Sequence, residues 1–217
     1  MMTKRTDLIM LRDAVGFFSK AGAALGAVFA CLCLAPDVAQ ADWQATEVVQ
    51  SYAISGKTGP ELYASIGERG PSVGGKGRAI AVTNFKLTWT RKYEPQANAC
   101  VLVSARPKLT ITYVLPKPAQ RLPTAMAEGW ETFINGVHKH ERVHGDLIKD
   151  MVRKIEAVSV GLSAADDPKC QKVRANLTDR LGELSRAQRQ QSRDFDRAEL
   201  SNGGNIHQLV LALINGR

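Results

Sequence analysis

Apolar side chains recur every three or four residues between positions 130 and 155, and this pattern restricts the fold more than any other feature. Such spacing places them on one face of an α-helix. The pattern predicts a helix from about Ala125 to about Leu162, with this face toward the body of the protein. The face is formed by Trp130, Phe133, Val137, His140, His144, Ile148, Met151 and Ile155.

The residues before this helix have the pattern of β-strands. Residues 83–93 alternate apolar and polar side chains, as a half-buried strand does. We expect strands at 46–54, 83–93, 99–105 and 109–115, and a short helix at 61–67. Strands first and helices second is typical of an α+β fold. We therefore expect a small antiparallel sheet from the N-terminal half.

A second long helix is predicted after the first. Residues 164–169 (AADDPK) interrupt the helical pattern, which resumes from about Cys170 to Leu200. Ser201-Asn202-Gly203-Gly204 ends it, and an apolar tail follows at 206–214. The predicted architecture is thus the sheet packed against two long C-terminal helices.

The N-terminus predicts export. Basic residues at positions 4, 5 and 12 precede an apolar run at 21–35, and Ala39-Gln40-Ala41 supplies a small-x-small cleavage site. The run is too short to span a membrane comfortably. We expect residues 1–41 to be a signal peptide, residues 42–217 to form a single domain without a transmembrane segment, and the location to be periplasmic or secreted.

Export changes the interpretation of the cysteines and of the charge. Cys31 and Cys33 lie within the expected signal peptide, which leaves Cys100 and Cys170 in an oxidising compartment. We expect these two to form a disulfide. The formal net charge of +8 attracts polyanions. For an exported protein we expect no nucleic-acid partner, and anionic cell-envelope material is the polyanion we expect instead.

The residues with the clearest chemical meaning are His140-Glu141-x-x-His144, an H-E-x-x-H pattern. Four residues along a helix return to the same face, so both imidazoles can reach one Zn²⁺ at about 2.0–2.1 Å. Glu141 lies beside them, where it can hold water at the metal and take its proton. His138 projects from a different side. The alternative is that the two histidines are ordinary core residues.

A catalytic zinc site needs a third protein ligand. Asp146 and Asp150 turn away from the histidines if the helix continues through them. Antiparallel pairing of the two long helices would place residue 140 opposite a residue near 192. The candidates for the third ligand are Asp194, Asp196, Glu199 and His207.

The mature chain resembles a bacterial domain of unknown function that is described as a predicted secreted zinc-dependent protease. The resemblance covers about residues 46–204. After the H-E-x-x-H pattern, Phe195-Asp196 corresponds to an aromatic-Asp pair of that domain. Where the domain continues with a His-Gly pair, this chain has Ser201-Asn202-Gly203, which favours Asp196. The shared residues are Tyr52, Ile54, Gly56, Thr58, Glu61, Leu62, Gly70, Pro71, Thr83, Leu87, Thr88, Trp89, Cys100, Leu115, Pro116, Trp130, Phe133, His140, Glu141, His144, Cys170, Phe195 and Asp196.

The resemblance implies a zincin-like metallopeptidase with Zn²⁺ as cofactor, His140 and His144 as ligands, and Glu141 as base. We expect the third ligand to be Asp196, with Glu199 and His207 as alternatives. The expected substrate is a peptide or protein. The alternative function is a non-catalytic cell-envelope binding or scaffolding protein that retains a metal site.

Overall fold

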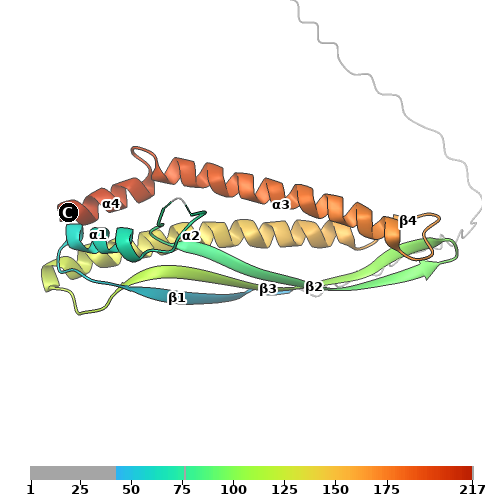
Figure 1. Cartoon of the computed structure of the whole chain (residues 1–217), viewed down its shortest axis with the longest axis horizontal. Coiled ribbons are helices and arrows are strands. Elements are labelled where there is room, and N and C mark those ends of the chain that lie inside the picture. The colour runs from blue at the N-terminus through green and yellow to red at the C-terminus, as the bar shows by residue number, and fades with distance from the viewer. Residues whose placement is uncertain (1–42, 76, 217) are drawn as a thin grey trace, which may run out of the picture. The chain divides into compact units, whose positions relative to one another are not determined.

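The computed structural model describes residues 43–75 and 77–216, so the expected signal peptide at 1–41 lies outside the described residues. The described chain has the α+β architecture that the sequence predicts (Figure 1). None of its helices is apolar over a stretch long enough to cross a membrane. In chain order the elements are β1 (Thr46–Ile54), α1 (Gly59–Arg69), β2 (Val82–Gln96), β3 (Ala99–Pro118), α2 (Thr124–Ser159), β4 (Ser163–Ala164), α3 (Gln171–Leu200) and α4 (Asn205–Asn215).

The sheet is mixed, and the expectation of a fully antiparallel sheet is wrong for one pair of strands. β2 and β3 form an antiparallel hairpin around a two-residue turn, where Ala97 has φ of 51°. β4 is also antiparallel to β3, but β1 runs parallel to it. The parallel pairing arises because α1 and β2 intervene, which returns the chain to β3 in the direction of β1.

The two strands predicted at 99–105 and 109–115 are one continuous strand, β3. Pro107 lies between them and pairs in register with Trp89 of β2. On the other side of β3, β4 pairs only with residues 100–101 and β1 begins only at residue 110. Pro107 therefore lies where β3 has a single neighbour, and a proline there need not interrupt the sheet.

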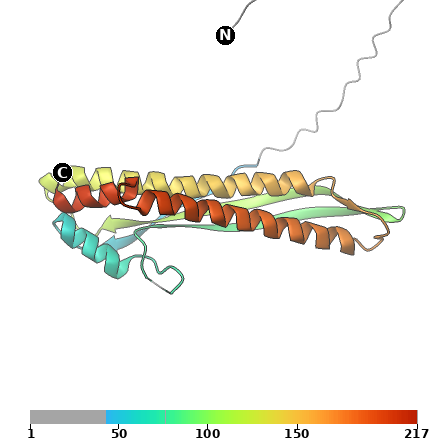
Figure 2. The same ribbon diagram turned by 90° about the horizontal axis from the view of Figure 1, so that it is seen from above.

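Helix α2 packs along the sheet, and α3 returns beside it in the opposite direction (Figures 1 and 2). The apolar face predicted for α2 is buried from Trp130 to Ile155, except at His144, which is partly exposed. Gly145 allows a close approach to the sheet, since a Cβ atom there would lie 2.2 Å from the hydroxyl of buried Tyr113. The core thereby fixes how α2 lies against β3.

The two ends of this layered structure are closed differently. At one end α1 and α4 gather beside the start of α2 (Figure 2), and the predicted apolar tail is the helix α4. At the other end a disulfide joins Cys100 of β3 to Cys170, just before α3. The predicted disulfide is confirmed. It closes a loop of 70 residues, which stabilises a fold by about 4 kcal/mol on chain-entropy grounds.

Candidate metal centre

The two histidines of the H-E-x-x-H pattern point at one another from α2. Both lie in the helix interior, so helical periodicity alone puts them on the same face. Their Nε2 atoms are 3.2 Å apart. Both side chains are largely buried, His140 at 6% and His144 at 12% exposure. Two nitrogen atoms that lie this close are arranged to share a proton or a cation.

Asp196 of α3 lies beside the two imidazoles. We call His140, His144 and Asp196 together the metal group, because they could hold a metal ion. Its Oδ1 atom lies 3.2 Å from Nε2 of His140 and 2.9 Å from Nε2 of His144. One atom from each of these residues can therefore face a common point, and within the described residues this is the group that could hold a metal ion. Asp196, which the sequence favoured as the third ligand, is brought to the histidines, while its side chain remains 42% exposed.

The spacing of these three atoms suits a tetrahedral ion. Ligands at about 2.0–2.1 Å in a tetrahedral site lie about 3.3 Å from one another. The three observed separations are 2.9, 3.2 and 3.2 Å. Among the described residues no lysine or arginine forms an ion pair with Asp196. The donor set, two imidazoles and one carboxylate, is one that Zn²⁺ accepts, and the three separations are slightly shorter than those of an occupied site.

Two further residues of α3, Phe195 and Glu199, lie against the imidazoles. The ring of Phe195 stacks on His140 at 4.7 Å and meets His144 edge-on at 5.4 Å. Glu199 places Oε2 3.6 Å from Nδ1 of His140, a buried atom with no hydrogen-bond partner in the described structure. Glu199 thus faces the nitrogen of His140 that points away from Asp196. This contact is one of the causes that raise the pKa of His140.

Glu141 faces the sheet beside the metal group. Its Oε2 atom lies 2.6 Å from the hydroxyl of Thr83 on β2, and its carbonyl oxygen lies 3.0 Å from the same hydroxyl. The hydroxyl has one proton, which it donates to one of these oxygens at a time. Glu141 is 5% exposed. Thr83 therefore fixes the carboxylate of Glu141 next to the histidines.

The charges of the site shift its pKa values in opposite directions. Burial would raise the pKa of Asp196, but the hydrogen bonds to His140 and His144 outweigh burial and lower it. Burial would lower the pKa of His140, but its contact with Asp196 and the charge of Glu141 raise it. In the absence of a metal, a proton on His140 and a negative charge on Asp196 stabilise each other.

The pKa of Glu141 is raised. Burial is the main cause, and the hydrogen bond from Thr83 and the nearby imidazoles oppose it without cancelling it. A carboxylate with a raised pKa binds a proton more readily than an ordinary glutamate. This is the property that a general base needs near neutral pH.

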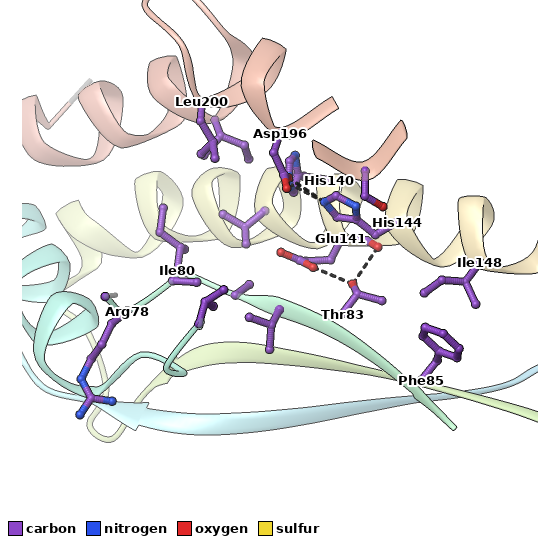
Figure 3. A pocket seen from close by; sticks show the side chains of 18 of the residues that line it. Arg78, Ile80, Thr83, Phe85, His140, Glu141, His144, Ile148, Asp196 and Leu200 are labelled. Carbon is purple, nitrogen blue, oxygen red and sulfur yellow. Dashed lines mark hydrogen bonds and ion pairs between the residues drawn. The ribbon is translucent and has the colours of Figure 1, made fainter. Parts of the chain in front are cut away.

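The metal group lies in the wall of a cavity of about 780 Å³ between α2, α3 and β2. Figure 3 shows His140, His144 and Asp196 in its middle, with Glu141 and Thr83 directed at each other below them. Ile80 and Leu200 lie on one side of the group, and Phe85 and Ile148 lie on the other. A ligand in this cavity can therefore contact the metal group and both flanks together.

The other candidate ligands from the sequence lie outside the metal group. Asp146 and Asp150 form ion pairs with Lys149 and Lys154, as expected for residues that turn away from the histidines. Asp194 pairs with Arg197 on the exposed side of α3. The alternative ligand His207 accepts a hydrogen bond at Nδ1 from the backbone N–H of Gly203. Its role here is to hold the turn between α3 and α4.

Sequence reasoning did not assign a role to Thr83, Phe195, Gln188 or Ser192. Thr83 binds Glu141 across 58 positions of sequence, and Gln188 and Ser192 line the cavity from α3. The signal for Thr83 was its place at the start of a half-buried strand. Its partner could be found only from the packing of β2 against α2.

A comparison with protein families finds one that matches most of this chain. Residues 49–204 match the family described as bacterial protein of unknown function, DUF922. The chain belongs to this family. The DUF922 match contains every residue of the metal group as well as Thr83 and Glu141, and it ends just before α4. No curated protein and no solved structure matches this chain.

Proposed function

We propose that this member of the DUF922 family is an exported zinc-dependent metallopeptidase that hydrolyses peptide bonds. The observation that carries the proposal is the convergence of His140, His144 and Asp196 beside a buried Glu141. The cavity that contains them is large enough for a stretch of peptide. The disulfide Cys100–Cys170 supports an oxidising location, periplasmic or secreted.

Each side chain of the site has a role in this proposal. His140, His144 and Asp196 would hold Zn²⁺, which supplies polarisation of the scissile carbonyl and a water with a pKa near 7. Glu141 accepts the proton of the attacking water and passes it to the leaving amine. Thr83 keeps the carboxylate of Glu141 directed into the cavity through the 2.6 Å contact. Phe195 and Glu199 orient His140.

The function of Glu141 is tested by the Glu141→Gln variant. We expect it to retain about one zinc ion per chain and to lose peptide hydrolysis by about 10²–10⁴-fold. Metal content is measured by atomic spectrometry, and hydrolysis with an unfolded protein substrate that a chelator should protect. Equal turnover by the variant and the natural chain would exclude Glu141 as the base.

A second function is a binding or scaffolding protein of the cell envelope, without turnover. One observation favours it: Asp196 lies within hydrogen-bond distance of Nε2 of both imidazoles, so these two nitrogen atoms have a partner even without a metal. Purified protein that contains no zinc and gains none on addition would support this function. Zinc without any hydrolysis would also support it.

A further inference from the structure

Exposed apolar side chains gather along the wall of the cavity. Eight large apolar residues are exposed in the described chain, and four of them line this one cavity. Because isolated apolar side chains on a surface are common, their gathering around one site is the informative observation. The four are Tyr63, Val73, Phe85 and Leu200.

Two of these side chains, Leu200 and Phe85, lie on opposite sides of the metal group. Figure 3 shows Leu200 and Ile80 on one side of it, and Phe85 and Ile148 on the other. Phe85 is 44% exposed and Leu200 is 54% exposed, so neither is committed to the core. A ligand that crosses the metal group therefore meets an apolar surface before and after it.

A free strand edge runs along the same cavity. β2 pairs with β3 on one side, and no other strand of the described chain pairs with it. Val82, Thr83 and Phe85 belong both to this edge strand and to the cavity wall. An edge strand offers main-chain N–H and C=O groups that an extended peptide can bind.

The walls offer little to an anionic ligand. Arg78 is the one lysine or arginine among the described residues that line the cavity, and its Nη1 atom donates a hydrogen bond to the carbonyl of Gly70. The acidic residues of the wall are Glu141 and Asp196. The net positive charge of the chain is thus not concentrated here, and apolar complementarity governs what the cavity accepts.

We infer that the cavity binds an extended polypeptide segment with a bulky apolar side chain on each side of the bond over the metal group. This inference rests on the proposed function and adds its substrate class. Folded proteins bury such segments. The substrate is therefore an unfolded or partly unfolded chain, cut internally rather than at its ends.

The first test measures binding separately from hydrolysis. A labelled octapeptide with leucine and phenylalanine around its central bond, blocked at both ends, is titrated against the zinc-loaded Glu141→Gln variant. Fluorescence anisotropy should give an affinity at least about tenfold higher than for the same peptide with aspartates at those positions. Equal affinity for the two peptides, or tighter binding of the acidic one, would overturn the inference.

Substitutions at the two flanks sharpen the test. Phe85→Asp and Leu200→Asp should each weaken binding of the apolar peptide about tenfold. Each variant loses the contact with the peptide side chain that lies on its own side of the metal group. Val160→Asp is the matched control, because Val160 is 45% exposed and lies outside the cavity. Thermal melting confirms that all three variants fold. Unchanged binding in both flank variants would overturn the inference.

The outcomes separate the two proposals. Peptides that bind with the expected preference but are never hydrolysed by the natural chain would refute the peptidase and support the binding cavity. Hydrolysis that is indifferent to apolar side chains, or that needs a free terminus, would support the peptidase and overturn the substrate class.

Discussion

Helices α2 and α3 both contribute to the metal group, but the structure holds them in different ways. Thirteen of the 36 residues of α2 are buried, against three of the 30 residues of α3. His140 and His144 therefore belong to the face that forms the hydrophobic core. Asp196 comes from a helix whose surface is mostly exposed.

Helix α3 is connected to the rest of the fold at both ends. The disulfide ties its start to β3, and Asn205 of α4 donates a hydrogen bond to Glu199 near its end. Between these points it has few buried side chains, among them Val173 and Leu177 near the disulfide. Two of the three candidate ligands are thus placed by the packing of α2 in the core, whereas the position of Asp196 depends on how α3 is anchored.

Zinc binding should suffer most when a histidine on the core-facing side of α2 is replaced. His144→Ala should reduce zinc from about one ion per chain to near none, because it removes one of the two imidazoles that the packing of α2 holds in place. Asp196→Ala should weaken zinc binding while leaving the pair of imidazoles intact. Titration with a zinc-sensitive dye measures both, and Asp194→Ala is the control because Asp194 pairs with Arg197. Equal losses in all three variants would contradict the assignment.

The disulfide tests the anchoring of α3. Replacement of Cys100 and Cys170 by serine should lower the free energy of unfolding by about 4 kcal/mol, measured in urea. Asp196 lies 26 residues beyond Cys170, about 39 Å along a helix. Zinc affinity of the folded variant should consequently change little. A large loss of zinc affinity would show that the disulfide at the start of α3 also positions Asp196.

Gly145→Ala tests the packing of α2. The added methyl group would meet the hydroxyl of Tyr113. Tyr113 is 2% exposed, and its hydroxyl donates a hydrogen bond to Glu47. We expect a loss of about 1–3 kcal/mol in the free energy of unfolding, since a buried ring cannot move aside freely. Gly182→Ala on α3 is a useful control, because the nearest atom there belongs to the flexible side chain of Arg186. An equal effect at both positions would contradict the comparison.

The smallest effect should come from Glu199. Glu199→Ala removes the carboxylate 3.6 Å from Nδ1 of His140 and should weaken zinc binding about tenfold. Glu199→Gln, which keeps the shape and an acceptor oxygen, should recover part of this affinity. A loss as large as that of Asp196→Ala would instead make Glu199 a ligand.

The buried helix α2 could be predicted from the sequence in more detail than the mostly exposed helix α3. The face of α2 was predicted residue by residue because burial imposes a helical period on it. Asp196 could be favoured only with the help of the resemblance, because an exposed helix carries many similar carboxylates. The parallel course of β1 was missed because strand direction is decided by tertiary packing, which leaves no periodic signal. The contact between Thr83 and Glu141 was missed for the same reason.

The parallel pairing of β1 also sets an order of assembly. The hairpin of β2 and β3 closes over a two-residue turn, whereas Thr46 of β1 must find Thr110 of β3. Short loops close at lower entropic cost than long ones. We therefore expect the hairpin of β2 and β3 to form first and β1 to pair with β3 afterwards, although β1 precedes both strands in the chain.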